Sequence, residues 1–114
     1  MQMKILPSIK DVTHIALIGR FDNFGIQTIE TEFQSYIESR MRPTIVDLSE
    51  VTLLPSAGMR MLLNGARVLR DKGTKMVLLS PSPLIEEVLR TACLDQIFPI
   101  VHDEHEALKL LIGR

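Results

Sequence analysis

The sequence predicts an α/β fold with a mixed, mostly parallel β-sheet of about five strands and four helices. Short apolar runs alternate with longer amphipathic segments, in the order β, β, α, β, α, β, α, β, α. A helix between two strands of one sheet requires a right-handed crossover, so the strands after the opening pair are expected to be parallel. No stretch is repeated or linker-like, and we expect residues 1–114 to form a single domain.

The chain begins with two predicted strands. Residues 3–6 and 12–18 are apolar runs, and the second is rich in the β-prone residue types Val, Ile and Leu. Residues 8–11 separate the two runs with the sequence Ser-Ile-Lys-Asp, which favours a turn. We therefore expect an opening hairpin.

A first amphipathic helix is predicted after residues 19–23. Its apolar residues recur at helical spacing: Ile26, Ile29, Phe33, Tyr36 and Ile37. Pro43 ends this helix, and residues 44–48 form a short apolar run of the kind that makes a buried central strand.

A second amphipathic helix is predicted over residues 56–72, and Gly73 is expected to end it. One side is apolar: Met59, Leu62, Leu63, Ala66 and Leu69. The other side is polar: Arg60, Asn64, Arg67 and Asp71. Met61 falls off the apolar stripe. Gly58 and Gly65 each cost a helix about 1 kcal/mol relative to alanine, so each is expected to permit a close approach, of a partner or of the sheet.

Strands and helices continue to alternate to the end of the chain. Residues 75–79 form the next predicted strand, and Ser82 with a proline behind it caps a third helix. The apolar residues of that helix are Leu84, Ile85, Val88, Leu89 and Ala92. Residues 97–101 form the last predicted strand, and the capping pair Asp103 and Glu106 opens a terminal helix.

Composition narrows the function classes. The 13 basic and 14 acidic residues leave a formal net charge of −1, so nucleic acid is not an expected partner. No apolar run reaches the roughly 18–20 residues that cross a bilayer, which excludes direct membrane insertion, and the start lacks a signal-peptide pattern. We therefore expect a cytoplasmic protein. Its one cysteine, Cys93, is expected to be a buried structural thiol.

No chemistry-bearing constellation emerges from the residue spacing. His102 and His105 supply two imidazoles without an evident third ligand, so we expect no metal site. No phosphate-binding glycine loop, catalytic triad or paired carboxylates are found, and we expect neither a cofactor nor enzymatic activity. A small enzyme or nucleotide binder is accordingly a weak candidate for the function.

Residues 45–63, with the sequence IVDLSEVTLLPSAGMRMLL, resemble the signature of STAS domains. That signature is an apolar strand ending in Asp-Leu-Ser, a short link, and Asp-Ser-Ser/Thr-Gly opening an apolar helix. Residues 19–22 and 89–98, followed by 106–108, are similar to the family's other segments, so the resemblance covers nearly the whole chain. It implies a STAS-type fold.

The resemblance also implies a function. Single-domain family members bind an anti-sigma factor of the histidine-kinase-like ATPase type, and a serine kinase inactivates them by phosphorylating the signature serine, here Ser56. A bacterial regulator of transcription that switches partners, with an associated phosphatase, is the expected role. The residues implied in partner binding are Asp22, Pro55, Ser56, Ala57, Gly58, Met59, Arg60, Asn64 and Arg67.

Two interpretations stay open at the signature. Pro55 and Ala57 replace the family's aspartate and second Ser/Thr, which favours the alternative of a constitutive STAS subunit in a transporter or signalling complex. The Ser56 hydroxyl is equally suited to cap the second helix by accepting a backbone hydrogen bond or to receive a phosphate at the positive end of the helix dipole.

Overall fold

A five-stranded sheet organises the fold, and its strands lie side by side in sequence order. The computed structural model describes residues 2–112. The first two strands are antiparallel, and every later neighbouring pair is parallel. The strands are β1 (Gln2–Ile9), β2 (Val12–Arg20), β3 (Thr44–Leu53), β4 (Met76–Leu79) and β5 (Ile100–Val101). The predicted mixed, mostly parallel sheet and its opening hairpin are confirmed.

Four helices connect or follow the parallel strands, as predicted. They are α1 (Asn23–Arg40), α2 (Ser56–Asp71), α3 (Pro83–Thr91) and α4 (Glu104–Ile112), and a short 3-10 turn, η1 (Leu94–Gln96), follows α3. The last strand is shorter than the predicted 97–101, because the chain first completes η1 and then passes through Pro99 before it pairs with β4.

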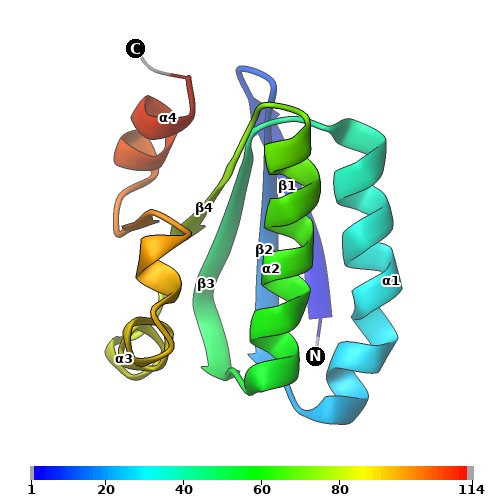
Figure 1. The fold of residues 1–114 in the computed structure, drawn as a ribbon, viewed down its shortest axis with the longest axis vertical. Helices are drawn as coiled ribbons and strands as arrows, with labels where there is room; N and C mark the ends of the chain where they lie inside the picture. The colour runs from blue at the N-terminus through cyan, green and yellow to red at the C-terminus, as the bar shows by residue number, and fades with distance from the viewer. Residues whose placement is uncertain (1, 113–114) are drawn as a thin grey trace.

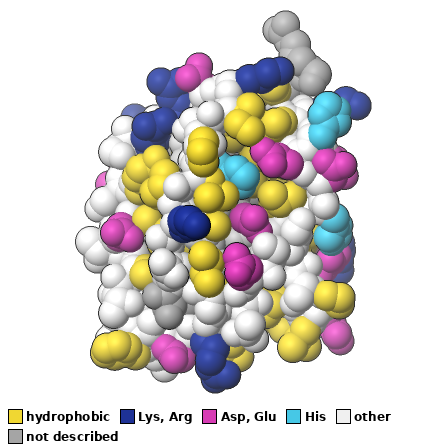
Figure 2. Space-filling model, turned by 180° about the vertical axis from the view of Figure 1, so that it is seen from behind, with side chains coloured by type: hydrophobic (Ala, Val, Ile, Leu, Met, Phe, Trp, Pro, Cys, Tyr) yellow, Lys and Arg dark blue, Asp and Glu magenta, His cyan; other side chains and the backbone are white. Residues whose placement is uncertain are grey.

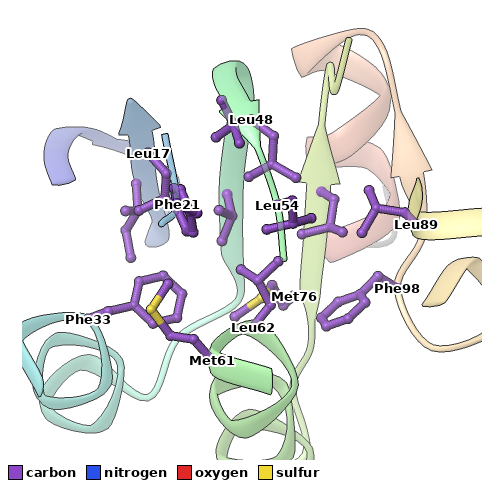
Figure 3. Packing of buried hydrophobic residues seen from close by; sticks show 14 of the residues in the cluster. Leu17, Phe21, Phe33, Leu48, Leu54, Met61, Leu62, Met76, Leu89 and Phe98 are labelled. Atoms are coloured by element: carbon purple, nitrogen blue, oxygen red, sulfur yellow. The ribbon is translucent and has the colours of Figure 1, made fainter. Parts of the chain in front are cut away.

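Helices cover both faces of the sheet. In Figure 1, α1 and α2 lie side by side over one face and run in the same direction. The main core lies beneath them, and Figure 3 shows Phe33, Met61, Leu62 and Met76 meeting between the helices and the sheet. On the opposite face α4 covers a smaller cluster that includes Val77. Figure 2 shows that this opposite face mixes apolar side chains with charges of both signs.

Side-chain caps fix where three of the helices begin. The carboxylate of Asp22 accepts a hydrogen bond from the Gly25 N–H at 2.7 Å and starts α1. The Ser82 hydroxyl accepts one from the Ile85 N–H at 3.3 Å and starts α3, as predicted. Asp103 accepts one from the backbone of the second residue of α4 at 2.7 Å. Each bond satisfies an amide that has no acceptor within its own helix.

Gly65 allows α2 to lie close to both α1 and the sheet. A Cβ atom at this position would stand 2.9 Å from Ile37 Cδ1, 3.2 Å from Phe33 Cε2 and 3.1 Å from Met76 Cε. The prediction that Gly65 lets its helix lie close to the sheet is therefore confirmed by the contact with Met76 of β4. Gly65 also lets α2 lie close to two side chains of α1. No room for a methyl group is left between the three elements.

The predicted placement of Met61 outside the apolar stripe is wrong. Met61 is 1% exposed and belongs to the main core. Its side of α2 faces α1 rather than solvent, and the sequence of one helix does not show that a second helix lies beside it. Helix α2 is accordingly buried both on the side that faces the sheet and on the side that faces α1, so its buried surface is wider than one apolar stripe.

Replacing Gly65 with alanine is expected to destabilise the fold. Overpacking a filled core costs about 1–3 kcal/mol, and the gain in helix propensity returns only about 1 kcal/mol. We predict that Gly65→Ala lowers the free energy of unfolding by about 1–2 kcal/mol in urea denaturation. An unchanged or raised free energy of unfolding would show that the contacts of Gly65 are loose.

Candidate functional site

The carboxyl ends of the parallel strands bring together the segments that the sequence analysis singled out. Arg20 at the end of β2 pairs with Leu53 at the end of β3, and the Phe21 N–H donates to the Leu53 carbonyl at 3.1 Å. Helices α1 and α2 therefore begin next to each other (Figure 1). We call this region, residues 20–24 and 53–60, the Ser56 edge.

Ser56 is the first residue of α2, and its side chain is exposed. The cap position is held by Pro55, which offers no side-chain hydrogen bond. Its carbonyl accepts the N–H groups of Gly58 at 2.9 Å and Met59 at 3.1 Å. The N–H groups of Ser56 and Ala57 precede these bonds and have no acceptor within the helix.

The interpretation of the Ser56 hydroxyl as a helix cap is wrong. A capping hydroxyl must belong to the residue before the helix, and that residue is Pro55. Within residues 2–112 the Ser56 hydroxyl makes no hydrogen bond to another group. It is presented to solvent at the positive end of the helix dipole.

Gly58 anchors this helix end to the core beneath it. A Cβ atom on Gly58 would lie 2.9 Å from Leu54 Cδ1 and 3.0 Å from Phe21 Cδ2, and both of these side chains are buried. Gly58 is itself buried, so it places the first turn of α2 against the end of β2. The position of Ser56 follows from this contact.

Two large apolar side chains at or near the Ser56 edge are exposed, and neither was among the predicted partner-binding residues. Phe24 in the first turn of α1 is 77% exposed, and Leu84 in the first turn of α3 is 65% exposed. Leu84 was predicted to lie with the apolar residues of its helix, but the buried residues of α3 are Ile85 and Leu89. Phe24 does not fit the helical spacing of the buried residues Ile26 and Ile29. This mismatch is the sequence signal from which its exposure could have been predicted.

A shallow apolar groove joins α2 to α3 beside Ser56. Its lining residues are Met59, Leu84, Glu87, Val88, Thr91 and Ala92. Met59, one of the predicted partner-binding residues, therefore faces Leu84. The groove extends the Ser56 edge with a mainly apolar surface.

The predicted partner-binding residues divide into two groups. Asp22, Pro55, Ser56, Ala57, Gly58, Met59 and Arg60 belong to the Ser56 edge. Asn64 and Arg67 lie further along α2 and line a second groove, between α1 and α2. Arg67 is eleven residues beyond Ser56, about 16 Å along the helix axis, so the two residues do not share a site.

Cys93 is exposed, and the expectation of a buried thiol is wrong. Helix α3 ends at Thr91, and Cys93 adopts a left-handed conformation with φ of 62° at the turn into η1. The side chain thus projects from a turn instead of the apolar face of a helix. Within the described residues no three His, Cys, Asp or Glu side chains gather in a way that could hold a metal ion.

An ion-pair network holds α3 to the segments that follow it. Arg90 donates to Glu86 Oε2 at 2.7 Å and to Asp95 Oδ2 at 3.3 Å, and Glu86 Oε1 lies 2.6 Å from His102 Nε2. The hydrogen bond from Arg90, followed by that from His102, holds the pKa of Glu86 below its ordinary value of 4.5. The network positions the helix that carries Leu84.

A family model described as the STAS domain matches residues 2–107. The chain belongs to the STAS domain family. The matched range contains the Ser56 edge, the groove beside it and the ion-pair network. No helix in the described part of the chain is long and apolar enough to cross a membrane.

Similar proteins carry the name anti-sigma factor antagonist. BtrV of Bordetella bronchiseptica, so named, is 26% identical over 91 residues, which cover 80% of this chain and 78% of BtrV. The unphosphorylated form of the antagonist SpoIIAA superposes with a TM-score of 0.82 at 20% identity, over 99% of this chain and 98% of SpoIIAA. The phosphorylated form of SpoIIAA, a Bacillus cell fate determinant, gives 0.71 at 18% identity, over 96% and 99%. The fold is that of an anti-sigma factor antagonist-like STAS protein.

The ion-pair network is expected to make stability depend on pH. The pKa of Glu86 is lower in the folded state than in the unfolded chain, so the network contributes its full stability above pH 4.5. That contribution is lost as the pH falls through the folded-state value. Urea denaturation is therefore expected to show Glu86→Gln less stable than the wild type at pH 7, with the difference vanishing in acid.

Glu87→Gln is the matched control, because Glu87 is the adjacent carboxylate on α3 and has no ion pair within residues 2–112. It is expected to follow the wild type at every pH. A loss of stability in Glu86→Gln that stays constant from neutral to acidic pH would contradict the role of the Glu86 carboxylate in the ion-pair network.

Proposed function

We propose that this chain is an anti-sigma factor antagonist-like regulator that acts by switching protein partners and catalyses no reaction of its own. The Ser56 edge would bind an anti-sigma factor or serine kinase of the histidine-kinase-like ATPase type in the bacterial cytoplasm. The observation that carries the proposal is the exposed Ser56 hydroxyl at the first position of α2, beside exposed apolar side chains.

The apolar side chains supply the binding surface. An exposed aromatic or aliphatic residue that packs into a partner's pocket commonly dominates the energy of an interface. Phe24 and Leu84 project from the first turns of two helices, and Met59 lies between α2 and α3. This surface therefore offers apolar anchors from three helices around one serine.

Phosphorylation of Ser56 would act as the switch. The phosphate would meet the N–H groups of Ser56 and Ala57 and the positive end of the α2 dipole, so the fold would tolerate it. It would add about −1.5 to −2 charges at the centre of the surface. A partner that buries Ser56 would then have to bury this charge, and binding would weaken.

A constitutive STAS subunit of a transporter or signalling complex is the second candidate. Pro55 and Ala57, in place of the family's aspartate and second hydroxyl, are the observation that favours it. In that role the same surface would bind an ATPase permanently, and Ser56 would stay unmodified. The two candidates therefore share a surface and differ in the chemistry of Ser56.

Binding to a purified histidine-kinase-like ATPase encoded by the same host tests the surface. We predict that Ser56→Asp and Leu84→Asp each weaken binding at least about tenfold in titration calorimetry, because each places a charge where the partner would bury an uncharged side chain. Leu110→Asp is the matched control. It makes the same change at a 41% exposed leucine on α4 and is expected to bind like the wild type.

Stability measurements separate a lost surface from a lost fold. The free energy of unfolding of Ser56→Asp is expected to equal that of the wild type or to exceed it by about 0.3–1 kcal/mol, because the substitution puts a carboxylate at a helix N-terminus. Wild-type affinity in both Ser56→Asp and Leu84→Asp, with weakened binding in Leu110→Asp, would place the binding surface on α4 and overturn the proposal.

A further inference from the structure

The neighbouring helices α1 and α2 carry opposite charge. Helix α1 contains three glutamates and one arginine, whereas α2 contains three arginines and one aspartate. The two helices run side by side in the same direction over one face of the sheet (Figure 1). One half of this helical face is therefore acidic, and the other half is basic.

A groove of about 470 Å³ separates the two helices along this boundary. Glu30 and Glu38 stand on its α1 wall and Arg67 on its α2 wall, while Met61 and Val68 line it with apolar atoms. Within residues 2–112 no ion pair joins α1 to α2. The charges on the two walls thus remain available to a molecule that packs against the two helices.

We propose that α1 and α2, on either side of this groove, together form the interface of a twofold homodimer. A twofold axis parallel to the two helices, in front of the face seen in Figure 1, places α1 of one copy over α2 of the second copy. The acidic wall of each copy then faces the basic wall of the other. An interface of this kind is isologous, because the same patch serves both copies.

Charge complementarity identifies the molecule that packs on α1 and α2 as a second copy. That molecule must present a basic surface to α1 and an acidic surface to α2, side by side and parallel. The chain offers this arrangement itself, and its formal net charge of only −1 adds little repulsion between copies. Since Met61 is 1% exposed, the contact depends mainly on charge and is expected to weaken as salt rises.

The proposed dimer presents both Ser56 edges in one direction. Rotation about an axis parallel to α1 and α2 leaves the first turns of all four helices at the same end. A partner with two matching sites would then bind both copies at once and gain avidity. This consequence does not depend on whether Ser56 is phosphorylated.

Two charge-reversed variants test the interface, and each is designed so that it cannot dimerise with itself. Glu30→Arg/Glu38→Arg makes both helices basic, and Asn64→Glu/Arg67→Glu makes the α2 wall acidic like α1. Sedimentation equilibrium is expected to show a wild-type dimer and at least about a tenfold weaker association of each variant with itself. An equimolar mixture of the two is expected to restore the dimer, because every wall again meets its opposite.

Glu32→Arg/Glu50→Arg is the matched control for the first variant. It makes the same change in net charge at two exposed glutamates outside the groove, and it is expected to dimerise like the wild type. Circular dichroism checks that every variant is folded. A wild type that stays monomeric at millimolar concentration, variants that dimerise alone, or a mixture that fails to associate would each overturn the proposal.

Discussion

The close packing of α2 against α1 and the sheet is the constraint on which the site depends. Gly58 and Gly65 lie on the buried side of α2, and a methyl group at either position would stand 2.9 Å from a core side chain. These contacts fix the height of the helix over the sheet and the point where its first turn meets the end of β3. Ser56 is exposed, whereas Gly58, two residues later, is buried against the core.

The proline before Ser56 changes what this helix end can do. An aspartate or serine in the cap position would use its side chain to satisfy one of the first amides of α2. Pro55 contributes only its carbonyl, so the Ser56 hydroxyl and the amides of Ser56 and Ala57 stay open to an added group. The substitution removes one acidic residue from the edge and leaves the helix dipole without a negative side-chain cap.

Much of the fold could be predicted from the sequence, because apolar periodicity reports which face of each element is buried. The order of strands and helices, the opening hairpin and the Ser82 cap all follow from local patterns and are confirmed. Two of the errors concern what lies beside a helix. Met61 is buried because α1 lies next to α2, whereas Leu84 is 65% exposed although it was counted with the apolar residues of its helix. One segment's sequence does not show what lies beside it in space.

The candidate site shows the same division. The signature around Ser56 is continuous in the sequence and could be recognised there, whereas Phe24 and Leu84 reach the same surface from other helices. Arg67 shares a sequence stripe with Arg60, yet it lines the grooves on both sides of α2, away from the Ser56 edge. Spacing along a helix predicts a common side, but the neighbouring elements decide which surface each residue joins.

The mass of the intact protein, purified from its own host, tests most directly whether Ser56 is a phosphorylation switch. If Ser56 is phosphorylated, part of the protein is expected to be heavier by one phosphate, about 80 Da. That species is predicted to be absent from a Ser56→Ala variant grown under the same conditions. A wild type without the added mass under every growth condition, or a Ser56→Ala variant that retains it, would contradict the switch.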